Sequence, residues 1–176
     1  MRRVQCEQVI ESDSADLDVI AVFEQSGGIC IAILSVRGGR VLGVNSQFPD
    51  AGLLETPEEI LDAFIPQYYL ASARAIPAEL ICSHEIKETN LVSEALSQAC
   101  GKKVRIAHAV RGVRQQFLEL AKTNAEEALA LRLATRDGQA KRLMDFAERF
   151  KCDAPERIEC FDISHTSGEA TVASCV

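Results

Sequence analysis

Asp162 is an acidic residue in a segment whose other residues are typical of a β-strand. Residues 159–166 read ECFDISHT, and a turn at Gly168 leads into a second β-rich run. An unpaired carboxylate in a buried strand is costly, so such a residue usually binds a cation, a proton or a partner charge. Asp162 is therefore the first candidate for a catalytic, metal-binding residue. His165 stands three residues later, and the sequence allows it either a catalytic role or a place in the turn.

A basic segment earlier in the chain offers a different chemistry, the binding of phosphate groups. The 22 residues from Gly101 to Lys122 hold six cations and one acid, Glu119, whereas the whole chain has a net charge of −7. A local basic patch on an acidic protein can bind a nucleic-acid backbone at one face. A solvated surface would have the same composition, so both interpretations stay open. The candidate DNA-binding residues are Lys102, Lys103, Arg105, Arg111, Arg114 and Lys122.

The composition is that of an ordinary globular protein, with 47% hydrophobic and 26% charged residues. No apolar run approaches the ~20 residues of a membrane helix, and the N-terminal residues contain no hydrophobic signal core. We therefore expect no membrane association and a cytoplasmic location. The seven cysteines form no CxxC pair and lie in apolar segments, so we interpret them as buried, reduced side chains.

The elements expected to position these residues begin with an antiparallel meander. Three β-rich runs, 18–24, 29–36 and 40–47, are separated by glycine pairs that suit hairpin turns. Helices and strands then alternate, with Thr56 as the N-cap of the first helix and Gly101 at the end of the second. The expected elements are a helix to about Leu70, a strand near 79–82, a helix over 88–99, a strand over 104–109, and helices over 113–135 and 139–150 separated by Arg136-Asp137-Gly138. This order predicts an α/β fold, a ribonuclease H-like mixed sheet with flanking helices.

The two hairpins of the chain resemble each other when the sequence is shifted by 140 residues. This shift places Asp162 opposite Val22. Two-metal nucleases need carboxylates on the first strand because Mg²⁺ and Mn²⁺ take oxygen ligands, and valine offers none. We therefore expect the first hairpin to belong to a metal-free copy of the fold. Glu24, on the same strand face as Val22, could contradict this, but we interpret it as an exposed residue at the strand end.

The segment 159–176 resembles the start of the endonuclease domain of the UvrC family of excinuclease subunits. FDISHT at 161–166 is the most specific part of the likeness, which covers essentially the whole chain. One departure is Val110, which stands where the family has proline before Arg-Gly. Further matching segments, in order, are MRRVQ at 1–5, DLDVIAV at 16–22, RGGRVLG at 37–43, VRGVR at 110–114 and LAKTNAEEAL at 120–129.

The resemblance implies a subunit that, with UvrA and UvrB, incises damaged double-stranded DNA on both sides of a lesion in nucleotide excision repair. It implies that Asp162 is the first metal-binding acid of the 5′-incision site, with Mg²⁺ or Mn²⁺ as cofactor, and that the other ligands lie beyond Val176. The chain would then be an internal fragment of the excinuclease. One carboxylate cannot hold two metals, so we expect the isolated chain to be inactive as an endonuclease.

On this interpretation the chain has four parts. They are the end of a UvrB-binding helix with a linker (1–16), a non-catalytic ribonuclease H-like domain (17–112), a helical connector (113–156) and the truncated first hairpin of a second, endonuclease domain (157–176). Two other functions stay open for the chain. One is a non-enzymatic DNA-binding scaffold, and the other is a nucleotide-binding protein of the actin- or kinase-like ribonuclease H fold, whose phosphate turns would use the glycine pairs.

Overall fold

The computed structural model describes residues 16–49, 56–71, 74–153, 155, 161–166 and 169–175. The segments 161–166 and 169–175 are described by their backbone alone. The chain forms two compact units that divide between Leu133 and Ala134. The first sixteen residues were expected to hold a helix end and a linker, and residues 1–15 of that part lie outside the described residues.

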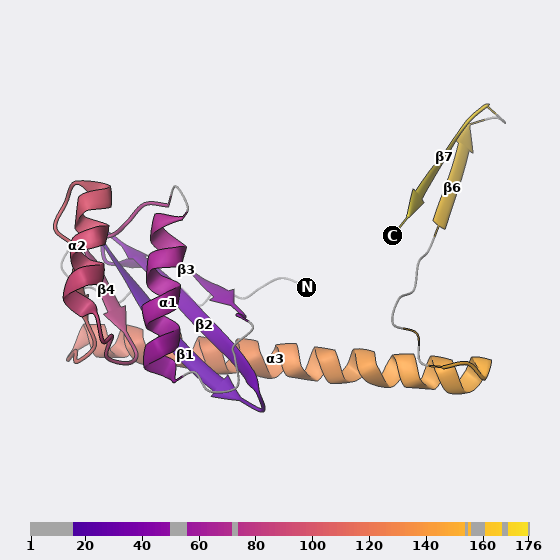
Figure 1. Cartoon of the computed structure of the whole chain (residues 1–176), viewed down its shortest axis with the longest axis horizontal. Coiled ribbons are helices and arrows are strands. Elements are labelled where there is room, and N and C mark those ends of the chain that lie inside the picture. Colours follow the sequence, from indigo (N-terminus) through magenta and orange to yellow (C-terminus); the bar gives the residue numbers. More distant parts are fainter. Residues whose placement is uncertain are drawn as a thin grey trace. The chain divides into compact units, whose positions relative to one another are not determined.

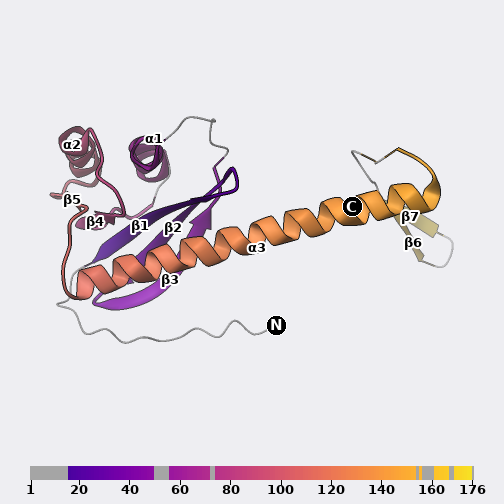
Figure 2. The same ribbon diagram turned by 90° about the horizontal axis from the view of Figure 1, so that it is seen from below.

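The first unit is built on a five-stranded mixed sheet (Figures 1 and 2). Strands β1 (Leu17–Gln25), β2 (Gly28–Arg37) and β3 (Arg40–Gln47) form the antiparallel meander predicted from the sequence. Strands β4 (Glu79–Cys82) and β5 (Arg105–Ala107) extend it as parallel neighbours, which gives the order β3-β2-β1-β4-β5.

Three of the four glycines of these pairs lie in the two hairpin turns of the meander, and Gly28 begins β2. Gly27, Gly38 and Gly39 have φ values of 73°, 55° and 76°, a region that residues with a Cβ atom rarely adopt. The two turns therefore need glycine for their own geometry, which accounts for these residues without a bound nucleotide.

Helices α1 (Pro57–Leu70) and α2 (Thr89–Cys100) cover one face of the sheet (Figure 2). Thr56 caps α1 as predicted, because its Oγ1 accepts from Glu59 N at 3.4 Å and Glu59 Oε2 accepts from Thr56 N at 3.2 Å. Gly101 ends α2 with a left-handed φ of 67°. The core on this face joins β-strand residues to both helices, among them Ile20, Val22, Ile31, Ile33, Leu61, Ile65 and Leu96.

Helix α3 (Val113–Phe150) is continuous, so the predicted break at Arg136-Asp137-Gly138 was wrong. A single glycine inside a helix costs only about 1 kcal/mol relative to alanine, which 38 residues of helix readily absorb. The first half of α3 packs on the other face of the sheet through Phe117, Leu118, Ala121, Ala125 and Leu129. The first compact unit therefore extends to Leu133 and includes residues that were expected to form a connector.

The second unit holds the end of α3 and a two-stranded antiparallel hairpin. The hairpin consists of β6 (Phe161–Thr166) and β7 (Glu169–Cys175), as the sequence predicts. In the part of the chain that the structure describes, no helix combines the length and the apolar character needed to cross a bilayer.

Candidate nucleic-acid interface and buried carboxylates

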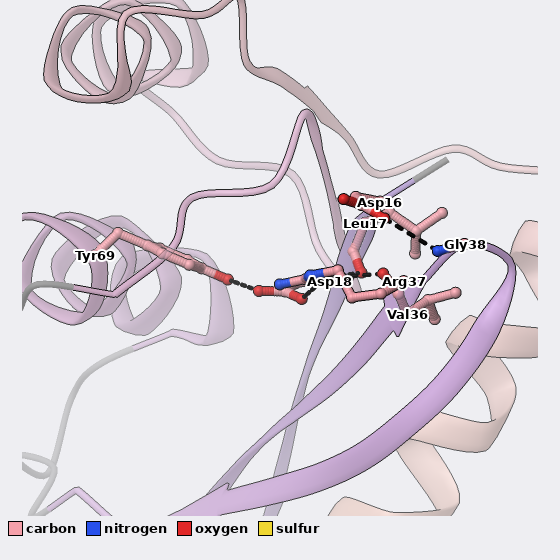
Figure 3. Close-up of polar contacts among 7 residues, drawn as sticks. All are labelled: Asp16, Leu17, Asp18, Val36, Arg37, Gly38 and Tyr69. Atoms are coloured by element: carbon pink, nitrogen blue, oxygen red, sulfur yellow. Dashed lines mark hydrogen bonds and ion pairs between the residues drawn. The ribbon is translucent and has the colours of Figure 1, made fainter. Parts of the chain in front are cut away.

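Asp18 lies almost fully buried on β1, with 3% of its surface exposed. Its Oδ1 accepts a hydrogen bond from Arg37 Nη1 at 2.7 Å, and its Oδ2 accepts from the Tyr69 hydroxyl at 2.7 Å (Figure 3). The same Arg37 nitrogen also donates to the carbonyl oxygens of Leu17 and Val36, at 3.0 and 2.8 Å. Both carboxylate oxygens of Asp18 are therefore engaged within the protein, and this acid joins β1 to β2 and to the last turn of α1.

The protonation states of the two partners suit this arrangement. Burial, followed by the charge of Asp18, raises the pKa of the Tyr69 phenol far above its usual value, so the hydroxyl remains a donor. Partial burial opposes the charge of Arg37, but the hydrogen bond and charge of Asp18 raise the pKa of Arg37 overall. The group is therefore a neutralised structural ion pair with a satisfied phenol, and not a free ligand for a cation.

Sequence reasoning missed Asp18, although it carried the same signal as Asp162. Both are acids within β-rich apolar segments, and the cost of burying a carboxylate applies equally to each. The structure gives Asp18 its counter-ion from a residue 19 positions away. Asp18 pairs with Ser35, two residues before Arg37, so an arginine diagonally across the predicted hairpin was the available signal for an ion pair.

A second buried acid, Glu79 at the start of β4, is paired with one of the six candidate DNA-binding cations. Arg114 Nε and Nη2 both donate to Glu79 Oε2, at 3.1 and 3.0 Å. The Glu79 side chain is 12% exposed and that of Arg114 is 48% exposed. Because Arg114 lies in the first turn of α3, this ion pair connects that helix to the sheet.

Replacing Arg114 by glutamine should lower the free energy of unfolding by about 1 kcal/mol, because Glu79 then keeps a largely buried charge without its partner. Urea denaturation followed by circular dichroism measures this change. The matched control is Lys122→Gln. The ion pair of Lys122 with Glu119 is longer, at 3.4 Å, and the two side chains are 42% and 57% exposed. Equal stability of Arg114→Gln and the unsubstituted protein would contradict a structural role for this ion pair.

The remaining candidate cations lie at the β5 edge of the sheet. Lys102 and Lys103 lie in the segment between α2 and β5, Arg105 begins β5, and Arg111 lies in the loop before α3. All four are exposed, and Lys122 on α3 is half-buried. Four of the six residues thus lie in β5 or in the segments that flank it, whereas Arg114 and Lys122 lie on α3.

The centre of β1 carries uncharged groups where the fold of a two-metal nuclease would place metal ligands. Val22 is buried in the core beside Ile31 and Ile33, and its backbone N–H donates to Ser83 Oγ at 3.1 Å. Glu24 is exposed near the end of β1, as expected. Among the described residues, no group of three or more His, Cys, Asp or Glu side chains could hold a metal ion.

The turns of the two hairpins differ from the 140-residue alignment by one position. Gln25 pairs with Gly28 at the end of the first hairpin, and Thr166 pairs with Glu169 at the end of the second. Counted back along each first strand from these pairs, Asp162 corresponds to Ala21 instead of Val22, although the pairing of the second hairpin shifts register between Ser164 and Thr166. Alanine also lacks a ligand atom, so the argument for a metal-free first copy holds in either register.

Asp162 itself lies on β6, with Ser174 as its partner across the hairpin. Its side chain, like that of His165, lies outside the described residues. The assignment of Asp162 as a metal ligand therefore stays a prediction.

A mixed sheet with three antiparallel strands, two parallel ones and helices on both faces defines a ribonuclease H-like α/β domain. Comparison with known families agrees: residues 16–132 match the "UvrC Ribonuclease H-like domain", and residues 147–176 match the "UvrC RNAse H endonuclease domain". The chain belongs to the UvrC ribonuclease H-like family.

Curated relatives match the whole length of the chain. UvrABC system protein C of Pseudomonas putida strain F1 is 50% identical over 178 residues, and that of Chromohalobacter salexigens is 46% identical over 177 residues. In both cases the match covers 100% of this chain and 29% of the relative. A Bacteroides thetaiotaomicron protein with an actin-like ATPase fold and unknown function matches at a TM-score of 0.32 and 12% identity, over 66% of this chain and 37% of that one. That likeness is too weak to support an argument.

Proposed function

We propose that this chain is part of an excinuclease subunit that acts with UvrA and UvrB in nucleotide excision repair, on damaged double-stranded DNA in the cytoplasm. The observation that carries the proposal is the succession of two family matches, a UvrC ribonuclease H-like domain followed by a UvrC endonuclease domain. The chain spans 29% of the length of its curated relatives, so the activity of a whole subunit is part of this proposal.

Asp162 is proposed as a ligand of Mg²⁺ or Mn²⁺ in the endonuclease domain. Its carboxylate fits the preference of these ions for oxygen ligands. A two-metal site needs further carboxylates in addition to Asp162. When bound, such ions stabilise the attacking and leaving oxygens of a phosphodiester during hydrolysis. The contribution of this chain is to hold Asp162 on a paired strand, opposite Ser174.

The first unit is proposed as a non-catalytic platform for the DNA backbone. Two observations support this role: uncharged residues fill the centre of β1, and both buried acids of the described chain, Asp18 and Glu79, are neutralised by arginines. Exposed cations at the β5 edge could then contact phosphate groups without opposing charges nearby. The non-enzymatic DNA-binding scaffold, one of the functions considered from the sequence, is thus the role proposed for this unit within the subunit.

The isolated chain is expected to leave damaged duplex DNA uncut, even with Mg²⁺ and UvrB present, because one proposed ligand does not form a two-metal site. Denaturing gel electrophoresis of an end-labelled duplex with a single lesion measures this. A longer protein that contains this chain and the rest of its endonuclease domain is the positive control, and it should incise in a UvrB-dependent manner. Incision by the isolated chain at the position cut by the longer protein would contradict the proposal, as would a longer protein that never incises.

A further inference from the structure

We propose that the six cations of the basic segment have two different tasks. Lys102, Lys103, Arg105 and Arg111 form a phosphate-binding surface, hereafter the basic edge, whereas Arg114 connects α3 to the sheet through Glu79 and Lys122 is paired with Glu119 on its own helix. The inference rests on the proposed function for the identity of the bound polyanion, which is duplex DNA. It deepens that function by separating the residues that contact the phosphate backbone from neighbours of equal charge.

The ion pairs of the described residues divide the six cations in this way. Arg114 is paired with Glu79 at 3.0 Å, and Lys122 with Glu119 at 3.4 Å. The described residues offer no ion pair to any cation of the basic edge, and all four side chains are exposed. An unpaired, exposed cation is free to exchange its counter-ions for phosphate, whereas a paired one must first lose its carboxylate partner.

The ion pair of Glu79 with Arg114 explains why Arg105 has no ion-pair partner among the described residues. Arg105 is the neighbour of Glu79 in the β4–β5 pairing, so this acid is the natural counter-ion of Arg105. Arg114 occupies Glu79 through two hydrogen bonds to one oxygen. The acid beside the edge is thereby neutralised from the helix side, and the charge of Arg105 remains available to a ligand.

The position of the basic edge suits an extended polyanion. β5 is the outermost strand of the sheet, and the loop that follows it runs on to the start of α3 (Figure 2). The 24 residues between Glu94 and Glu119 contain no acid. Lys103 and Arg105 stand about 7 Å apart along an extended chain, which spreads the charges along the edge instead of concentrating them at one point. A repeating phosphate backbone matches this arrangement, and arginine can contact a phosphate through two parallel hydrogen bonds.

Two double variants with the same change of charge test the division. Lys103→Gln with Arg111→Gln removes two cations of the basic edge, and Arg114→Gln with Lys122→Gln removes the two paired ones. The probe is a fluorescein-labelled 30-base-pair duplex, titrated by fluorescence anisotropy over a range of salt concentrations. Removing the edge cations should lower the slope of log K against log salt by about two, because each phosphate contact contributes about 0.9. The unfolding midpoint in urea should stay unchanged.

The paired variant should show a lower unfolding midpoint and a salt slope that falls by at most about one, because the released Glu79 can neutralise only its strand neighbour Arg105. If it does not fold, Lys122→Gln alone replaces it and is compared with Arg111→Gln. Equal slopes in the matched variants would overturn the division, since net charge alone would then explain binding. Arg40→Glu, at the opposite edge strand, is a further charge control and should leave the slope unchanged.

Three more results test the phosphate assignment and separate this inference from the proposed function. Polyglutamate should bind far more weakly than the duplex, and equal affinity would overturn the assignment to a phosphate backbone. If the two double variants had equal salt slopes while the protein still incised damaged DNA, the basic edge would be refuted and the proposed function would stand. If a longer protein bound duplex DNA through the basic edge in a salt-dependent manner but never incised it, the proposed function would be refuted and the basic edge would stand.

Discussion

Replacing Asp18 by alanine should destabilise the first unit by about 3–5 kcal/mol, the usual cost of removing one partner from a buried ion pair. The change leaves the Arg37 guanidinium beside two carbonyl oxygens without its carboxylate, and it leaves the Tyr69 hydroxyl without an acceptor. A typical domain is stable by only about 5–15 kcal/mol, so this loss would bring the unit close to unfolding. Urea denaturation at neutral pH measures it.

Tyr69→Phe is the matched control for Asp18→Ala. It removes one hydrogen bond but keeps the ion pair and most of the packing, so the expected loss is about 1 kcal/mol. Asp18→Asn should lie between the two, because the amide can still accept from one partner. A loss for Asp18→Ala no larger than that for Tyr69→Phe would mean that the ion pair with Arg37 adds nothing to stability.

Replacing Asp162 by asparagine, in a longer protein that contains the complete endonuclease domain, should reduce 5′ incision about a thousand-fold. Metal ions contribute several kcal/mol to such a transition state, and about 4 kcal/mol corresponds to a factor of a thousand in rate. Cleavage on the 3′ side and affinity for duplex DNA should remain, because Asp162 is not part of the basic edge. Gel analysis of products from a duplex with a lesion, labelled at either end, separates the two incisions.

Glu169→Gln is the control for Asp162→Asn, since it neutralises an acid on the partner strand of the same hairpin. It should keep 5′ incision within a few-fold of the unsubstituted protein. Unchanged 5′ incision by Asp162→Asn would remove Asp162 from the proposed metal site. Equal loss in both variants would mean that the hairpin needs negative charge in general and not a ligand at one position.

Much of the fold was predictable because it depends on local signals. Thr56 is the N-cap of α1 as expected, Gly101 ends α2, and β4 has the expected bounds of Glu79–Cys82. The glycine turns specify the meander through their backbone conformation. Reliance on local signals also produced the wrong prediction of a helix break. The local Arg-Asp-Gly signal was given more weight than the helical propensity of the residues around it.

The amino-acid sequence was enough to indicate the family, through FDISHT and the segments before it, and to locate the candidate acid and the basic segment. Which of the charges are free became clear only from the folded arrangement. Asp18 meets Tyr69 from 51 residues away, and Arg114 meets Glu79 across 35 residues. No local pattern specifies such partners, because they are selected by how the helices pack on the sheet. The electrostatic role of a residue depends on that long-range contact, so residues of the same type in one short segment, Arg111 and Arg114, acquire different tasks.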